Sequence, residues 1–183
     1  MRKPAGLKLN LPSNSLQQVF INDGVFYVHA SSSDSFEGLC IFRALLSMEE
    51  IDGTGWFHKE GLKSGERGYT VENMYKNQPV SQGVSLSYSQ NYGEAINYFH
   101  YIRKEAYPVL YGLGSGVNER LSSRYMMANP TGHPVSDGGL NIDYIMAIYV
   151  PADKVADAQN RLSSVPKLRE IVRPLAQNIF ESM

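Results

Sequence analysis

Apolar residues alternate with polar ones in part of the chain and form short unbroken runs elsewhere. The alternation at 84–88 and the apolar runs at 109–113 and 144–150 predict strands. The run at 39–44 predicts a further short, buried strand. These segments are the expected framework of a sheet.

A hairpin is predicted near the N-terminus. Two apolar runs, at 17–21 and 25–29, flank the sequence Asn22-Asp23-Gly24. Asp-Gly tolerates the positive φ angles that a tight turn between two antiparallel strands requires. We therefore expect both runs to be strands.

Helical spacing of apolar positions indicates the remaining elements. From Asn91 onward the apolar residues share one helical face: Tyr92, Ala95, Ile96, Phe99 and Ile102. Ser47-Met48-Glu49-Glu50 has the form of a capping box, which predicts the start of a short helix. The segment 152–162 is predicted to be helical. Pro166 is expected to begin an amphipathic helix over Lys167–Phe180, kinked at Pro174.

The mixture of strands and helices favours the α+β class, because the elements do not alternate as strict βαβ units. A chain of 183 residues fits one domain with a substantial core. We find no internal repeat and no composition shift that would mark a boundary. The prediction is a single domain over 1–183, with its core at about 38–155 and C-terminal helices in 152–183.

Charge and composition exclude several classes of function. Seventeen basic and 18 acidic residues give a net charge of −1 without a basic block, so nucleic-acid binding is not expected. No stretch approaches the roughly 20 apolar residues of a membrane span, and the N-terminus lacks the apolar core of a cleavable signal. Cys40 is expected to be a buried, inert thiol, and the four histidines lack metal-ligand spacing, so no metal site is predicted.

Four polar residues in three segments interrupt or border apolar runs and are candidates for chemistry. Arg43 lies within an apolar run, where a guanidinium must turn to solvent, pair with a carboxylate or clamp the oxygens of a ligand. Ser85 and Ser87 are expected on one face of their strand, facing water or bracing a site. Asp143 follows a Gly-rich loop and either caps that loop or stabilises positive charge on a sugar.

The order of these segments resembles the mono-ADP-ribosyltransferase toxins of the arginine–serine–glutamate class, which includes the cholera and pertussis enzymes. The resemblance covers about 38–155. Phe42-Arg43-Ala44 is similar to their aromatic–arginine segment, and Gly83-Val84-Ser85-Leu86-Ser87 to their serine-rich strand. Asp143-Tyr144-Ile145, followed by Val150-Pro151, is similar to the segment that carries their catalytic glutamate.

The resemblance implies a mixed or antiparallel two-sheet core with flanking helices, and NAD as a substrate. Arg43 would hold NAD together with Ser85, Ser87 and Tyr88, whose ring would stack on nicotinamide. Asp143 would be the catalytic carboxylate, with Ser85 and Arg43 completing the catalytic set.

The acceptor implied by the resemblance is a side chain of a host protein. The loop at 132–140 would recognise it, with His133 and Asn141 in contact. The protein would be a monomeric bacterial effector or toxin, a virulence factor secreted without a cleavable signal peptide that acts in the host cytosol.

Two departures from the family pattern leave alternatives open. Asp143 is one methylene shorter than the family's glutamate, and Asn141 stands where arginine-modifying members have Glu or Gln. An asparagine cannot take a proton from the acceptor. The alternatives are a catalytically inactive binding module on the same scaffold, with Lys167–Phe180 as its partner surface, and an NAD glycohydrolase that uses water as the acceptor.

Overall fold

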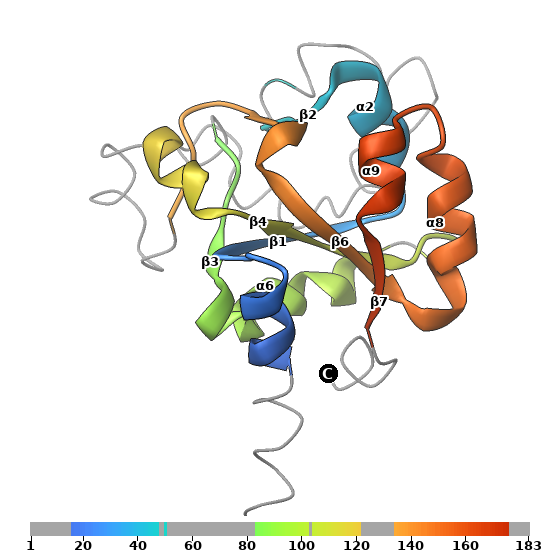
Figure 1. The fold of residues 1–183 in the computed structure, drawn as a ribbon, viewed down its shortest axis with the longest axis horizontal. Coiled ribbons are helices and arrows are strands. Elements are labelled where there is room, and N and C mark those ends of the chain that lie inside the picture. The colour runs from blue at the N-terminus through green and yellow to red at the C-terminus, as the bar shows by residue number, and fades with distance from the viewer. Residues whose placement is uncertain (1–15, 48–49, 51–82, 103, 122–133, 176–183) are drawn as a thin grey trace, which may run out of the picture.

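The computed structural model describes residues 16–47, 50, 83–102, 104–121 and 134–175. Within them a central sheet has the order β3-β1-β4-β6-β7, and a second sheet pairs β2 with β5 (Figure 1). The central strands are β1 (Tyr27–Ser32), β3 (Ser87–Tyr88), β4 (Pro108–Leu113), β6 (Ile145–Pro151) and β7 (Val172–Leu175). The small sheet joins β2 (Ala44–Leu45) and β5 (Leu140–Asn141). The predicted α+β class is therefore confirmed, as are the strands predicted at 109–113 and 144–150.

The central sheet is mixed. β1 pairs antiparallel with both β3 and β4, β4 pairs antiparallel with β6, and β6 pairs parallel with β7. Parallel pairing needs a crossover, and the chain provides it with α8 (Val155–Arg161) and α9 (Pro166–Glu170) between β6 and β7. The helix predicted over 152–162 is present as η7 (Ala152–Lys154) followed by α8.

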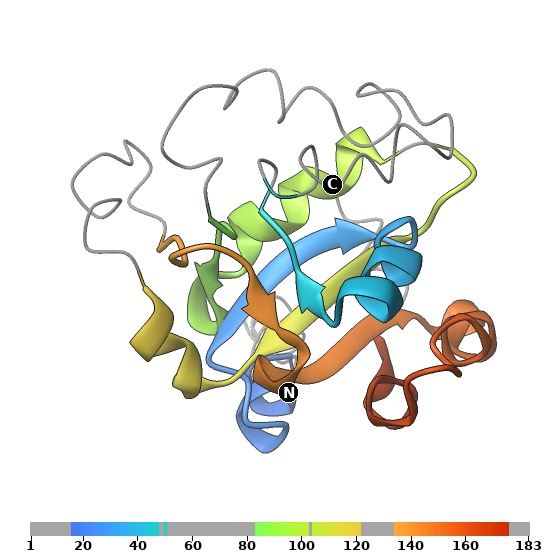
Figure 2. The same cartoon turned by 90° about the horizontal axis from the view of Figure 1, so that it is seen from above.

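One face of the central sheet is covered by α2 (Ser35–Phe42), the small sheet, α8 and α9, as seen from above in Figure 2. Their buried apolar side chains pack on inward-facing residues of β1, β4 and β6, and include Phe36, Leu39, Leu140, Leu162 and Leu168. This is the larger of the two core clusters, and it contains the residues next to the candidate site.

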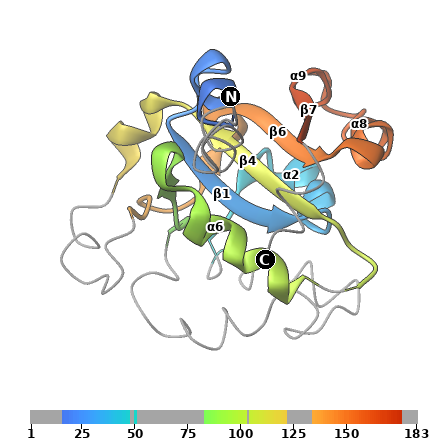
Figure 3. The ribbon, with the colours of Figure 1, turned by 90° about the horizontal axis from the view of Figure 1, so that it is seen from below.

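The opposite face carries a helix at 16–22, α6 (Gly93–Asn97) and η4 (Tyr98–Tyr101), visible from below in Figure 3. Ile96 is buried, and Tyr92, Ala95 and Phe99 pack against the cluster formed with Val28, Leu110 and Tyr149. The apolar helical face predicted from Asn91 is confirmed. Three short 3₁₀ segments complete the described elements: η3 (Ser89–Asn91), η5 (Ser115–Arg120) and η6 (Ile142–Tyr144).

The predicted N-terminal hairpin is wrong, because residues 16–22 form a helix. Leu16 and Phe20 are buried four residues apart on one helical face. The Asp-Gly turn ends this helix: Gly24 has φ +72°, its N–H donates to Ile21, and the N–H of Val25 donates to Phe20. Those two bonds form a Schellman motif, so the glycine connects a helix to β1 instead of joining two strands.

The strand predicted at 39–44 is also wrong, since most of that run belongs to α2. Phe36 and Leu39 lie three residues apart and both face the core, which a helix allows and a strand does not. The helix ends at Arg43, whose φ of +55° is left-handed. Only Ala44 and Leu45 then extend, as β2.

The long C-terminal helix is wrong beyond its first turns. Pro166 begins α9 as predicted, but the helix ends at Glu170 and the chain forms β7. Pro174 lies in this edge strand, where a missing N–H is tolerated. The partner surface expected at Lys167–Phe180 is therefore not one helix over 167–175, and 176–180 lie outside the described residues.

A polar contact fixes the edge strand to the N-terminal turn. The hydroxyl of Tyr149 donates to Asp23 at 2.7 Å, and Arg173 Nε lies 3.5 Å from the other oxygen of that carboxylate. Burial, followed by the bond to Asp23, raises the pKa of Tyr149, so its hydroxyl stays a donor. The first and last described segments thus meet across β6.

The capping box is confirmed at the residues that can be described. The N–H of Glu50 donates to Ser47 Oγ at 3.2 Å, and Glu50 Oε2 accepts from the N–H of Ser47 at 2.7 Å. The end of that predicted helix lies outside the described residues, as does His133. No helix in the described part of the chain has the length and apolar character needed to cross a membrane.

Candidate functional site

The three polar sequence motifs meet along one segment, Val135–Asp143. Ser85 bridges to Val135, Gly83 bridges to Gly138, and β2 pairs with β5 through Ala44–Asn141 and Leu45–Leu140. The N–H of Ile142 also donates to the carbonyl of Arg43 at 3.1 Å. Segments separated by 40 or more positions in the sequence are therefore neighbours in the fold.

Close packing holds the serine segment against this central segment. A Cβ at Gly83 would lie 1.9 Å from the carbonyl oxygen of Ser136, so only glycine fits there. Buried Ser136 accepts a hydrogen bond from the N–H of Val84 at 2.9 Å and donates one to the carbonyl of Gly138 at 2.6 Å. Ser136 was not predicted to hold these segments together, because nothing in the sequence distinguishes it from the other polar residues of a turn-rich stretch.

Glu50 fixes the other end of the same segment. Besides its capping bonds to Ser47, its Oε1 accepts from the N–H of Gly139 at 3.1 Å. The carboxylate therefore joins the start of a helix to the residue before β5. The capping box was visible in the sequence, whereas the second bond spans 89 residues and carries no local signal.

Arg43 lies at the end of a helix, not at the end of a strand as predicted. Among the described residues it is the one non-glycine residue with positive φ. Its N–H donates to Leu39 and its carbonyl accepts from Ile142, so the backbone is held on both sides. The side chain is exposed, which leaves the guanidinium at the surface beside β5.

Asn141 and Asp143 lie next to Arg43, on β5 and η6. Asn141 Oδ1 accepts from the N–H of Asp143 at 2.9 Å, which caps η6. The Asp143 carboxylate contacts the ammonium group of Lys167 on α9, and the Asp143 side chain is 74% exposed. Asp143 therefore contributes its N–H to the cap made by Asn141, while its carboxylate lies at the surface in contact with Lys167.

The serine segment forms the edge of the central sheet for two residues only. Ser87 and Tyr88 pair with Val28 and Tyr27 of β1. The residues before them, 84–86, are bonded to 134–136 instead. Ser85 is exposed and Ser87 is 6% exposed, so the two residues differ in burial although a common face was expected. Tyr88 is 45% exposed and packs against Tyr27, with ring centroids 5.3 Å apart.

His29 lies where the serine segment separates from β1. Its Nδ1 is 2.8 Å from the carbonyl oxygen of Ser85. A carbonyl only accepts, so Nδ1 carries the proton and Nε2 keeps its lone pair. Burial lowers the pKa of His29, an effect partly offset by the bond to Ser85, so the ring is neutral at pH 7. From the sequence, His29 was weighed only as a metal ligand. Its polar ring directly after the apolar residues 25–28 was a local signal for a site residue.

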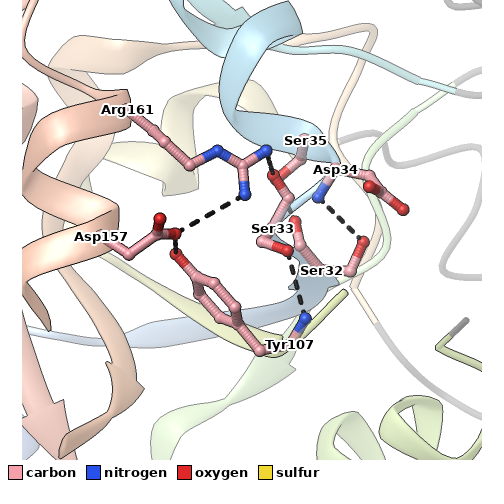
Figure 4. A network of polar contacts seen from close by, with 7 residues as sticks. All are labelled: Ser32, Ser33, Asp34, Ser35, Tyr107, Asp157 and Arg161. Atoms are coloured by element: carbon pink, nitrogen blue, oxygen red, sulfur yellow. Dashed lines mark hydrogen bonds and ion pairs between the residues drawn. The ribbon is translucent and has the colours of Figure 1, made fainter. Parts of the chain in front are cut away.

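A polar network holds the connection between β1 and α2 (Figure 4). Tyr107 donates its hydroxyl hydrogen to Asp157 at 2.7 Å, and Asp157 lies 3.8 Å from Arg161. Arg161 donates to the carbonyl of Ser33 at 2.9 Å, while Ser33 Oγ accepts from the N–H of Tyr107 at 3.1 Å. The network therefore joins α8 to the short connection between β1 and α2, residues 33–34.

The predicted site residues thus fall into two adjoining groups. Arg43, Asn141 and Asp143 lie together around β5, while Ser85, Ser87 and Tyr88 lie along the serine segment, where His29 joins them. The backbone of 135–143 connects the groups, and the Asp143 carboxylate contacts Lys167. Within the described ranges, no three His, Cys, Asp or Glu side chains gather as metal ligands would.

The chain was compared with protein-family models, with curated proteins and with solved structures. No family model, no curated protein and no solved structure matches it.

Proposed function

We propose that this protein is a mono-ADP-ribosyltransferase that transfers ADP-ribose from NAD to a side chain of a host protein. The observation that carries the proposal is the backbone pairing of 135–143 with both β2 and the serine segment. An arginine, a serine and a carboxylate from distant parts of the sequence can act on one ligand only if their segments adjoin. These three segments do adjoin.

In this proposal the exposed Arg43 guanidinium binds the pyrophosphate of NAD through two parallel hydrogen bonds. Ser85 and the neutral His29 flank the ribose, where Nε2 of His29 accepts a hydrogen bond from a sugar hydroxyl. Tyr88 presents an exposed ring on which nicotinamide stacks, and Ser87, the preceding residue of the strand, is buried.

Asp143 supplies the negative charge for the reaction. When the bond to nicotinamide breaks, positive charge develops at the anomeric carbon, and a nearby carboxylate lowers the barrier electrostatically. Asn141 stands two residues earlier on the same surface and is the proposed contact to the acceptor. On the family resemblance alone, we also propose that the protein is a secreted bacterial effector that acts in a host cytosol.

The alternative is a catalytically inactive module on the same framework. Two contacts favour it: the Asp143 carboxylate contacts Lys167, and Asn141 Oδ1 accepts from the N–H of Asp143. Both polar groups expected to act on substrates therefore already have partners within the chain. A module of this kind would bind NAD without breaking it.

The test is release of nicotinamide together with transfer of labelled ADP-ribose from NAD in a eukaryotic cell lysate. Asp143→Asn removes the charge at nearly constant size. Arg43→Asn removes the guanidinium with a residue that tolerates the left-handed backbone, whereas alanine would add strain. Asp153→Asn is the matched control, because Asp153 is 65% exposed and also pairs with a lysine.

Transfer to a lysate protein by the wild type and the control, lost in both site variants, is the expected result. Nicotinamide release without a labelled protein would instead identify an NAD glycohydrolase. NAD binding without nicotinamide release, by folded protein, would overturn the transferase proposal in favour of the module.

A further inference from the structure

Lys167 occupies an unusual position relative to the candidate carboxylate. It is the second residue of α9, and its ammonium group contacts Oδ1 of Asp143. The adjacent Leu168 is fully buried, so the backbone is anchored while the lysine side chain remains 48% exposed. A primary amine thus lies on the carboxylate that the proposed reaction uses.

We infer that Lys167 is a self-modification site, an internal acceptor of ADP-ribose; this inference rests on the proposed function. If a ribose hydroxyl binds the Asp143 carboxylate, that hydroxyl and Lys167 Nζ share one carboxylate as a hydrogen-bond partner. With hydrogen bonds of about 3 Å, a hydroxyl on Oδ1 lies within about 6 Å of Nζ and one on Oδ2 within about 8 Å. Rotation of the flexible lysine stem brings Nζ to the anomeric carbon, where attack requires about 3–3.5 Å.

The chemical step balances with NAD as the co-reactant. The Lys167 ammonium first gives one proton to water, and the resulting amine attacks the anomeric carbon, forming a C–N bond to Nζ and leaving a second proton to be lost. The bond from that carbon to nicotinamide breaks, and its electron pair neutralises the pyridinium charge. The proton that Nζ sheds passes to Asp143 or to water, so a nucleophile and its base are in contact from the start.

Lys154 provides a matched control within the same chain. The Lys154 side chain is 43% exposed, similar to the 48% of Lys167. Its Nζ also lies near an aspartate, 3.9 Å from Asp153. It follows the seven residues of β6, whereas Asp143 precedes them. At about 3.4 Å per residue, the strand separates Lys154 from Asp143 by roughly 24 Å. Lys154 therefore has similar exposure and charge without access to the candidate carboxylate.

The experiment incubates the purified full chain with NAD labelled in its adenosine half, without any other protein. Label on the chain and nicotinamide released are measured together for wild type, Lys167→Gln and Lys154→Gln, and peptide mapping locates the label on the wild type. We expect label on Lys167, and a fall of at least about tenfold in label per nicotinamide released for Lys167→Gln alone.

The outcomes separate this inference from the function on which it rests. Nicotinamide release by the wild type without self-labelling, or labelling that survives Lys167→Gln, overturns the inference and leaves the proposed function standing. Label mapped to Lys154 overturns it as well. Absence of nicotinamide release by the purified chain overturns the inference, and the proposed function is then decided by transfer of label in the lysate.

Discussion

The Nδ1 atom of His29 donates a hydrogen bond of 2.8 Å to the carbonyl oxygen of Ser85, across 56 residues of sequence. The bond forms where the serine segment separates from β1 and turns to pair with 134–136. It satisfies a carbonyl that has left the central sheet, and it orients the imidazole. One contact therefore couples the shape of the sheet edge to the tautomer of a candidate binding residue.

Stability should depend on pH through His29. Burial lowers its folded-state pKa, so the unfolded chain binds the proton more readily. The contribution of His29 to the free energy of unfolding is full above the ordinary histidine pKa of about 6.5. It is lost as the pH falls through the lowered pKa of the folded state. Between about pH 7.5 and about pH 5, the Tm from thermal unfolding should fall less for His29→Gln than for the wild type. Equal declines would contradict the assignment of a neutral, half-buried imidazole.

Gly83→Ala should destabilise the protein, because the new Cβ would lie 1.9 Å from the Ser136 carbonyl. Overpacking of this kind costs about 1–3 kcal/mol. Gly38→Ala is the control, since nothing lies within 4 Å of its Cβ and it is in the interior of α2. That change should stabilise by about 0.5–1 kcal/mol. Urea denaturation measures both, and equal effects at the two glycines would argue against the close approach.

Tyr107 and Asp157 should be energetically coupled in their effects on stability, because a hydrogen bond joins them. The phenol stays protonated because burial, followed by its bond to Asp157, raises the pKa of Tyr107. In a cycle of Tyr107→Phe, Asp157→Ala and the double variant, we expect a coupling of about 0.5–1.5 kcal/mol by chemical denaturation. Strictly additive changes would mean that the network in Figure 4 contributes no pairwise energy through this bond.

The length of the Asp143 side chain should control the rate if the transferase proposal holds. Asp143→Glu moves the carboxylate by about 1 Å, which should lower nicotinamide release about a hundredfold without unfolding the chain. The measurement is initial rate at saturating NAD, with circular dichroism as the check on folding. An unchanged rate would mean that a shift of about 1 Å in the carboxylate does not control the reaction.

Lys167→Gln should leave stability almost unchanged. The ion pair with Asp143 is largely exposed, and such pairs contribute less than about 1 kcal/mol. Urea midpoints of Lys167→Gln and the wild type should agree closely. A large loss would mean that the contact supports the fold, and labelling results with this variant would then have to be read against its folded fraction.

Several elements could be predicted because their signals are local. The apolar runs at 109–113 and 145–150 form strands, the stripe from Tyr92 packs as a helical face, and Pro166 begins a helix. The capping bonds between Ser47 and Glu50 span three residues, so the sequence contains both partners. Each of these features depends on residues within about two turns of one another.

Two of the three errors have their origin in apolar runs too short to show their period, and the third lies in the longer predicted helix Lys167–Phe180. Residues 17–21 and 39–42 are helical, and 172–175 are extended, each against the prediction. In every case the packing partner decided the outcome: Phe20 and Leu39 face the sheet from helices, and Val172 pairs with Ile148. Tertiary contacts override weak local preference in such segments.

The candidate site shows the same division. The sequence by itself determined which residues were available, namely an arginine after an apolar run, serines on a short strand and a carboxylate before the longest strand, together with the turns and caps between them. Only the tertiary structure decided that their segments adjoin along 135–143, that His29 joins Ser85, and that Lys167 contacts Asp143. The physical reason is that caps and turns form between near neighbours in the chain. Strand register and ion pairs between distant segments instead depend on how the whole core closes.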